Sequence, residues 1–140
     1  MKLESTKVNI DKSAQEVFDF LTTIENFKSL MPENTSKFEI LDSETFLFAL
    51  SGMPEIVLKK KSMDPPHKIV LGAAGGKLDF SLTALIVSSS ESQSEVQLTF
   101  DGEFNAMMAM MIKAPITKFI ETLAINIPKA VELIHQLQLF

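Results

Sequence analysis

Four residue types are missing from the sequence: cysteine, tryptophan, tyrosine and arginine. Without cysteine the chain has no disulfide, thiolate metal ligand or thiol nucleophile, and we expect it in the cytoplasm. Without arginine it lacks the side chain that binds phosphates and carboxylates through two parallel hydrogen bonds. Phenylalanine supplies all 11 aromatic residues. A cavity lined by them would offer apolar surface but no phenolic hydroxyl.

Long apolar runs and clusters of positive charge are also scarce. No stretch approaches the roughly 18 apolar residues of a membrane-spanning helix, so we expect no integral membrane association. The first 30 residues are interrupted by charges and do not resemble a signal peptide. Acidic residues outnumber basic ones by 18 to 13, and the one basic run, Lys59–Lys61, is short. Nucleic acid is therefore not expected as a partner, because phosphate binding needs clustered positive charge.

The N-terminal part predicts a strand followed by two short helices. The chain has 140 residues, 46% of them hydrophobic, which fits one domain spanning residues 1–140. Val8 and Ile10 alternate with polar residues, as in a strand. Ser13 and Glu16 have the spacing of a capping box, which marks a helix start. A second short helix is predicted from Ile24 to Leu30.

The middle of the chain predicts a sheet with one buried face. From Phe38 to Phe104 the apolar residues recur at every second position within short segments. The turns expected between the segments are Asp42–Glu44, Gly52–Pro54, Asp64–Pro66, Gly75–Gly76 and Ser88–Ser94, and the longest alternation runs from Leu78 to Ile86. Because sequential strands joined by short turns pair as neighbours, we expect six strands in an antiparallel meander.

The last third of the chain predicts one long helix that covers the apolar face of the sheet. Pro115 fits the first turn of the main helix or a kink after a Met-rich turn, and Pro128 predicts a bend. From Ile116 to Gln138 this helix would be about 35 Å long. Its apolar residues at helical spacing are Ile112, Ile116, Phe119, Ile120, Leu123, Ile127, Val131, Ile134 and Leu137.

This order of elements resembles the START/Bet v 1-like superfamily, also called SRPBCC or the polyketide cyclase/lipid transport group. The local resemblance is best from Val8 to Leu21 and continues from Ile24 to Phe27, as a strand, a small-residue cap and an aromatic helix. It implies an α+β helix-grip fold, in which a curved antiparallel sheet of about seven strands, in β-α-α-β6-α order, wraps around a long C-terminal helix. It also implies a deep apolar cavity, used in relatives for lipids, sterols, plant hormones and polyketides.

The residues expected to line such a cavity come from the inward face of the sheet and from the final helix. They are Phe46, Phe48, Ile56, Leu58, Leu71, Phe80, Leu82, Leu98, Phe100, Met107, Met111, Ile116, Phe119, Ile120 and Leu123. Alternation alone does not distinguish a lined cavity from a solid core. The methionines allow the same two interpretations, a pliable pocket mouth or irregular core filling. On a helix Met107, Met110 and Met111 share a face and Met108 lies off it.

Candidate residues for other chemistry are few. His67 and His135 have no second ligand at metal-binding spacing, so no metal and no cofactor is expected. Asp79, Asp101 and Glu103 fall on the polar phase of their strands, and no catalytic residue is assigned. Lys60 continues the inward phase of its strand, where it would anchor a ligand carboxylate or extend from the strand end into water.

These observations predict a protein that binds a hydrophobic small molecule between sheet and final helix without catalysis. Two alternatives stay open at this stage. A cyclase or hydratase acting on a hydrophobic substrate would need inward polar groups, of which the sequence offers few. An interaction or co-chaperone-like module would show an exposed apolar patch in place of an internal void. The sequence makes no prediction of the oligomeric state.

Overall fold

A computed structural model of the chain describes residues 1–74 and 79–138, with residues 134–138 described by their backbone alone. The predicted Gly75–Gly76 turn and the inward position of Leu78 lie outside the described residues. The same holds for the side chains of Ile134, His135 and Leu137.

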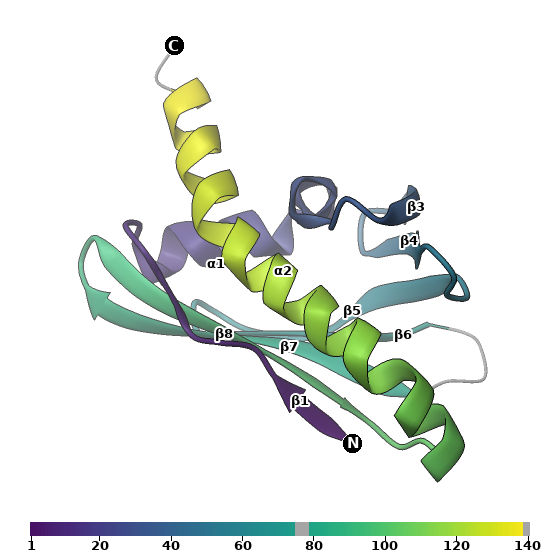
Figure 1. The fold of residues 1–140 in the computed structure, drawn as a ribbon. Coiled ribbons are helices and arrows are strands. Elements are labelled where there is room, and N and C mark those ends of the chain that lie inside the picture. Colours follow the sequence, from purple (N-terminus) through teal and green to yellow (C-terminus); the bar gives the residue numbers. More distant parts are fainter. Residues whose placement is uncertain (75–78, 139–140) are drawn as a thin grey trace.

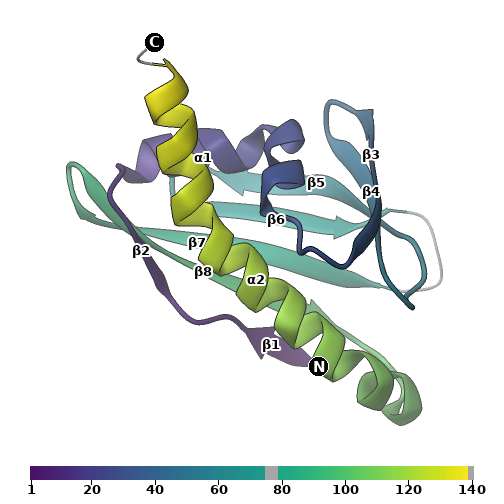
Figure 2. The ribbon, with the colours of Figure 1, turned by 45° about the horizontal axis from the view of Figure 1, so that its top comes forward.

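The long C-terminal helix lies across the concave face of a curved antiparallel sheet (Figures 1 and 2). The elements are β1 (Lys2–Glu4), β2 (Val8–Ile10), α1 (Ala14–Thr22), the 3-10 helix η1 (Ile24–Leu30), β3 (Thr35–Asp42), β4 (Thr45–Leu50), β5 (Ile56–Asp64), β6 (Lys68–Ala73), β7 (Phe80–Ser90), β8 (Gln93–Gly102) and α2 (Ala106–Gln138). The strand order is β1-β8-β7-β6-β5-β4-β3, with β2 also paired to β8. The predicted helix-grip fold is confirmed.

The N-terminal edge of the sheet differs from the prediction, because two short strands take the place of one. Both β1 and β2 pair with β8, which makes eight strands instead of about seven. Between them Ser5, Thr6 and Lys7 lie opposite only Gln97 and Leu98, so the edge contains a bulge. The Ser5 hydroxyl fits this bulge by accepting the backbone N–H of Leu98 at 2.9 Å.

The two N-terminal helices cover one part of the concave face. Ser13 and Glu16 form the predicted capping box, in which the Ser13 hydroxyl accepts the Glu16 N–H and the Glu16 carboxylate accepts the Ser13 N–H. Helix α1 contacts β6, β7 and β8, and η1 contacts β3 and α2. The side chains they bury are Ala14, Val17, Phe18, Phe20, Leu21, Ile24, Phe27 and Leu30.

Helix α2 starts earlier than predicted and is longer. The Asn105 side chain accepts the N–H of Met108 at 2.8 Å, as an N-cap does, so the helix begins at Ala106. Its 33 residues correspond to roughly 50 Å. Pro115 and Pro128 both lie inside it, and its axis turns in the final third in both views (Figures 1 and 2).

The inward stripe of α2 is the predicted one as far as the side chains are described: Ile112, Ile116, Phe119, Ile120, Leu123, Ile127 and Val131 are buried. Two polar contacts hold the helix in place. Asn126 donates its side-chain amide to the Leu30 carbonyl at 3.0 Å, and Glu121 accepts the hydroxyl of Thr6 at 3.1 Å. No described helix has the length and apolar composition needed to cross a membrane.

Candidate ligand-binding site

The centre of the space between sheet and α2 is nearly filled. The cavity that remains there is only about 20 Å³, room for about one water molecule. Side chains from α1 and η1, namely Leu21, Phe27 and Leu30, reach into this space and close it. Four of the predicted lining residues surround this small void: Leu71, Leu82, Leu98 and Leu123.

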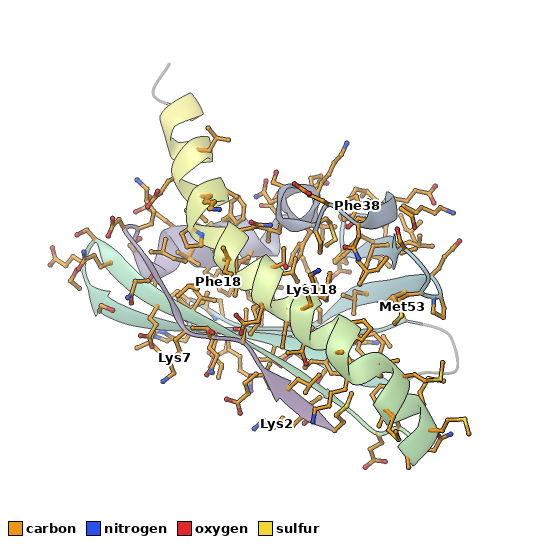
Figure 3. The ribbon with its side chains drawn as sticks, viewed as in Figure 1. Lys2, Lys7, Phe18, Phe38, Met53 and Lys118 are labelled. Carbon is orange, nitrogen blue, oxygen red and sulfur yellow. The ribbon has the colours of Figure 1, made fainter. Side chains whose placement is uncertain are left out.

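A column of phenylalanine rings continues this packed region. The Phe46 ring lies 5.0 Å from that of Phe27 and 6.0 Å from that of Phe48, and Phe48 stacks on Phe119 at 5.0 Å. The ring of Phe38, labelled in Figure 3, also lies 5.5 Å from that of Phe46. Four predicted lining residues are buried in the core and border neither this small void nor the two larger spaces described below: Phe46, Phe48, Leu58 and Ile120.

A larger cavity, which we call the inner cavity, lies beneath the first turns of α2. Its volume is about 190 Å³. The stacked rings of Phe80, Phe100 and Phe104 form one wall, with centroids 5.1 and 6.0 Å apart. The remaining lining residues are Gly52, Met53, Pro54, Ile56, Met108, Met111, Ile112 and Ile116. All of these side chains are apolar, and five of the predicted lining residues are among them: Ile56, Phe80, Phe100, Met111 and Ile116.

Gly102 leaves room for the Phe104 ring beside the Cβ atom of Phe80. A Cβ atom at this position would lie 2.7 Å from the Phe104 ring and 2.8 Å from the Phe80 Cβ. Because real Cβ contacts are longer than this, any side chain at Gly102 would displace one ring. The shape of the inner cavity therefore depends on a glycine at the end of β8.

The methionines at the start of α2 divide between solvent and cavity. Met107 and Met110 are 74% and 82% exposed and do not line the inner cavity, so the predicted Met107 lies outside it, whereas Met111 lines it although it is 66% exposed. Met108 lines the cavity instead, although the prediction set it apart from the shared face. Its spacing of four and eight residues from Ile112 and Ile116 is the sequence signal that identifies it.

A second opening, which we call the outer cleft, adjoins the inner cavity. It measures about 320 Å³, and its walls are Pro32, Asn34, Leu50, Ser51, Gly52, Met53, Pro115, Lys118 and Phe119. Gly52 and Met53, in the turn between β4 and β5, line both spaces, and Met53 is labelled in Figure 3. Gly52 has φ +82°, a conformation that suits glycine, and Met53 donates its N–H to the Leu50 carbonyl at 2.9 Å. Of the predicted residues only Phe119 lies here.

The described lining of the inner cavity contains no ionisable side chain. The buried polar residues among those described are all uncharged: Ser5, Thr45 and Ser94. A hydrogen bond from Lys37 to Glu55 raises the pKa of that lysine, and the backbone N–H of Glu44 lowers the pKa of the Asp42 carboxyl. Both groups are exposed on the surface, so neither is placed for acid–base chemistry in the cavity.

The other polar candidates lie elsewhere too. Asp79, Asp101 and Glu103 are exposed, and Lys60 lines neither the inner cavity nor the outer cleft. His67 is an exposed residue whose Nδ1 lies 3.3 Å from the carbonyl oxygen of Ile86. Within residues 1–74 and 79–133, no group of three His, Asp or Glu side chains is placed to hold a metal ion.

The fold and the apolar cavity beneath its long helix define a helix-grip protein. No protein-family model and no curated protein matches the sequence. Among solved structures, a norcoclaurine synthase mutant from Thalictrum flavum with a transition-state analogue matches with a TM-score of 0.74 at 14% identity, over 97% of this chain and 96% of that one.

Two bacterial structures match over a similar share of the chain. A START superfamily protein from Mycobacterium smegmatis has a TM-score of 0.70 at 14% identity, over 95% of this chain and 98% of that one. A protein from Thermus thermophilus has a TM-score of 0.72 at 12% identity, with the same coverage of 95% and 98%. The chain therefore has the START/Bet v 1-like fold of the SRPBCC group, as the sequence resemblance predicted.

Proposed function

We propose that this protein binds a hydrophobic small molecule, of lipid or polyketide-like character, in the inner cavity and does so without catalysis. One observation carries the proposal: a cavity of about 190 Å³ whose lining side chains are all apolar. Such a space offers water few hydrogen-bond partners, and an apolar protein cavity of about 150 Å³ stays dry and takes up benzene. The absence of cysteine is compatible with a cytoplasmic location for this activity.

The size of the inner cavity favours a small ligand. Sites for drug-sized molecules span roughly 300–1,000 Å³, whereas this cavity has about 190 Å³. A single ring with a short substituent, or a short acyl chain, fits without rearrangement. Larger ligands require the walls to move, and Met108 and Met111 are the lining side chains best suited to this because thioether chains are unbranched and adaptable.

The enzyme alternative has less support. Catalysis of a cyclase or hydratase kind needs ionisable groups that converge on the substrate. Norcoclaurine synthase shows that this fold accommodates an enzyme. In the present chain, however, the described walls of the inner cavity contain no ionisable side chain, which favours binding over reaction.

Thermal unfolding in the presence of apolar compounds tests the proposal. A ligand that binds only the folded state at about 100 times its Kd adds about 2.7 kcal/mol to the free energy of unfolding. For a chain of this size we expect the Tm to rise by about 10 °C. The panel contains short fatty acids, their esters and substituted benzenes. A panel that leaves the Tm unchanged would contradict the proposal and favour the interaction-module alternative.

A pair of variants on β5 tests whether the ligand binds in the inner cavity. Ile56→Phe adds three carbons at the wall of the inner cavity and fills part of it, so the ligand-induced rise in Tm should largely disappear. Val57→Phe is the matched control, because Val57 is also half-buried on the same strand but does not line the cavity. It should retain the full rise. If Ile56→Phe retains it as well, the ligand binds elsewhere.

A further inference from the structure

The inner cavity and the outer cleft are neighbours along one edge of α2. Ile116 lines the first, while Pro115, Lys118 and Phe119 line the second. Across from the helix the two spaces share Gly52 and Met53. Because the half-buried Met53 side chain borders both spaces, its movement would join them, and a thioether chain changes its path at little cost.

The two spaces differ sharply in polarity. All lining side chains of the inner cavity are apolar, whereas the outer cleft contains the Lys118 ammonium, the Asn34 amide and the Ser51 hydroxyl. Lys118 is the single ionisable residue among the described linings of both spaces, and the ion pairs found in the described residues involve other lysines, Lys2 and Lys37. Its positive charge therefore has no acidic side chain opposite it.

The donors of the outer cleft are available to a ligand. The Asn34 carbonyl accepts both the N–H and the hydroxyl of Ser51, at 2.9 and 3.0 Å, so the backbone at this corner is satisfied. No described group hydrogen-bonds the Asn34 side-chain amide or the Lys118 ammonium, both of which belong to exposed residues. An ammonium and an amide N–H beside one cleft form a suitable environment for a carboxylate.

We propose that the inner cavity and the outer cleft form one site for a small amphipathic carboxylic acid. Its apolar body occupies the inner cavity, and its carboxylate lies in the outer cleft against Lys118. This inference rests on the proposed function and names the ligand class. A single lysine balances one negative charge, and without arginine the site lacks the bidentate donor typical of phosphate binding, so a monoanion is preferred over a phosphate dianion.

The distance between the inner cavity and Lys118 favours a short acid. From Ile112, in the wall of the inner cavity, to Lys118 there are six residues of helix, or roughly 9 Å. Phenylpropionate matches this length, and its ring would then lie in the inner cavity. Its amide has the same shape without the charge, so the pair of ligands isolates the contribution of the carboxylate.

Isothermal titration calorimetry with phenylpropionate and phenylpropionamide tests the inference on three proteins. These are the wild type, Lys118→Gln and the control Lys113→Gln, whose lysine is exposed on α2 but lines neither space. An exposed ion pair contributes up to about 1 kcal/mol, so Lys118→Gln should weaken binding of the acid by roughly threefold to fivefold. Amide binding should stay unchanged, and Lys113→Gln should resemble the wild type with both ligands.

The salt dependence of binding provides an independent test of the contact between Lys118 and the carboxylate. Because exposed charge pairs are screened, added NaCl should weaken acid binding to the wild type and have little effect on Lys118→Gln. Equal affinity of the wild type for acid and amide, or an equal loss of both in Lys118→Gln, would overturn the inference while leaving hydrophobic binding intact. So would binding of other apolar compounds but of neither member of this pair. If no compound binds at all, the proposed function itself fails.

Discussion

Replacing Phe46 by leucine tests whether the phenylalanines of the concave face form a packed core. The Phe46 side chain is fully buried, and its ring lies within 6.0 Å of the rings of Phe27, Phe38 and Phe48. Phe18→Leu is the matched control, because Phe18, labelled in Figure 3, is only 7% exposed but has no ring partner in the described part of the chain. Both variants lose the same atoms, so the cost of reduced volume largely cancels.

The ring contacts set the expected difference between the two variants. An aromatic pair contributes about 0.5–1.5 kcal/mol beyond the area that it buries. Three pairs would add about 1.5–4.5 kcal/mol if they were independent, but they share the Phe46 ring and are not additive. We therefore expect Phe46→Leu to lower the free energy of unfolding by about 2 kcal/mol more than Phe18→Leu.

Urea unfolding followed by far-UV circular dichroism measures this difference, since the chain has no tryptophan for fluorescence. With a slope of about 2 kcal/mol per molar urea, the midpoint of Phe46→Leu should lie about 1 M below that of Phe18→Leu. The slopes themselves should agree. Equal midpoints would refute the reasoning, because they would mean that the stacked rings contribute nothing beyond their volume.

Two further predictions concern Gly102 and Asp42. Gly102→Ala should lower the free energy of unfolding by about 1–3 kcal/mol and weaken ligand binding, because the new Cβ displaces Phe104 at the cavity wall. Gly72→Ala, whose nearest neighbour is a flexible lysine stem, should cost less, and equal costs would contradict this account. The backbone N–H of Glu44 donates a hydrogen bond to the Asp42 carboxylate and lowers its pKa in the folded protein. The ionised carboxylate therefore stabilises the folded protein at pH values above the unfolded pKa of about 3.9. This stabilisation is lost as the pH falls through the lower folded pKa. An NMR titration should place the Asp42 pKa below 3.9, and Asp42→Asn should lack this part of the acid dependence of unfolding.

Local sequence signals predicted most of the fold because each acts over a few residues. Ser13 and Glu16 satisfy one another across a single helical turn, so their spacing alone locates the start of α1. The alternation from Phe80 to Ile86 likewise follows from the pleat of a strand, and the buried face is the predicted one. The order of these elements then identifies the helix-grip fold.

Features that depend on a partner distant in sequence were not predicted. The bulge at Ser5 exists because its hydroxyl accepts the N–H of Leu98, and nothing near Ser5 indicates that contact.

The start of α2 had a local signal in Asn105, but Pro115 further along the chain was the more prominent candidate. With the start misplaced, the methionines were compared only with one another, so the spacing of Met108 from Ile112 and Ile116, which places it inward, was not used.

The position of the cavity follows from what packs opposite each inward residue. A two-residue period identifies the face of a strand, but not which part of that face is covered by large side chains. Leu82 and Phe80 are successive inward residues of β7, and the first meets Leu21 and Phe27 around the small central void while the second borders the inner cavity. The N-terminal helices fill the centre, whereas the inner cavity is covered by the first turns of α2 and the turn between β4 and β5. Because this division depends on where α1 and η1 end, a variant that shortened η1 would extend the cavity toward the centre and admit longer ligands.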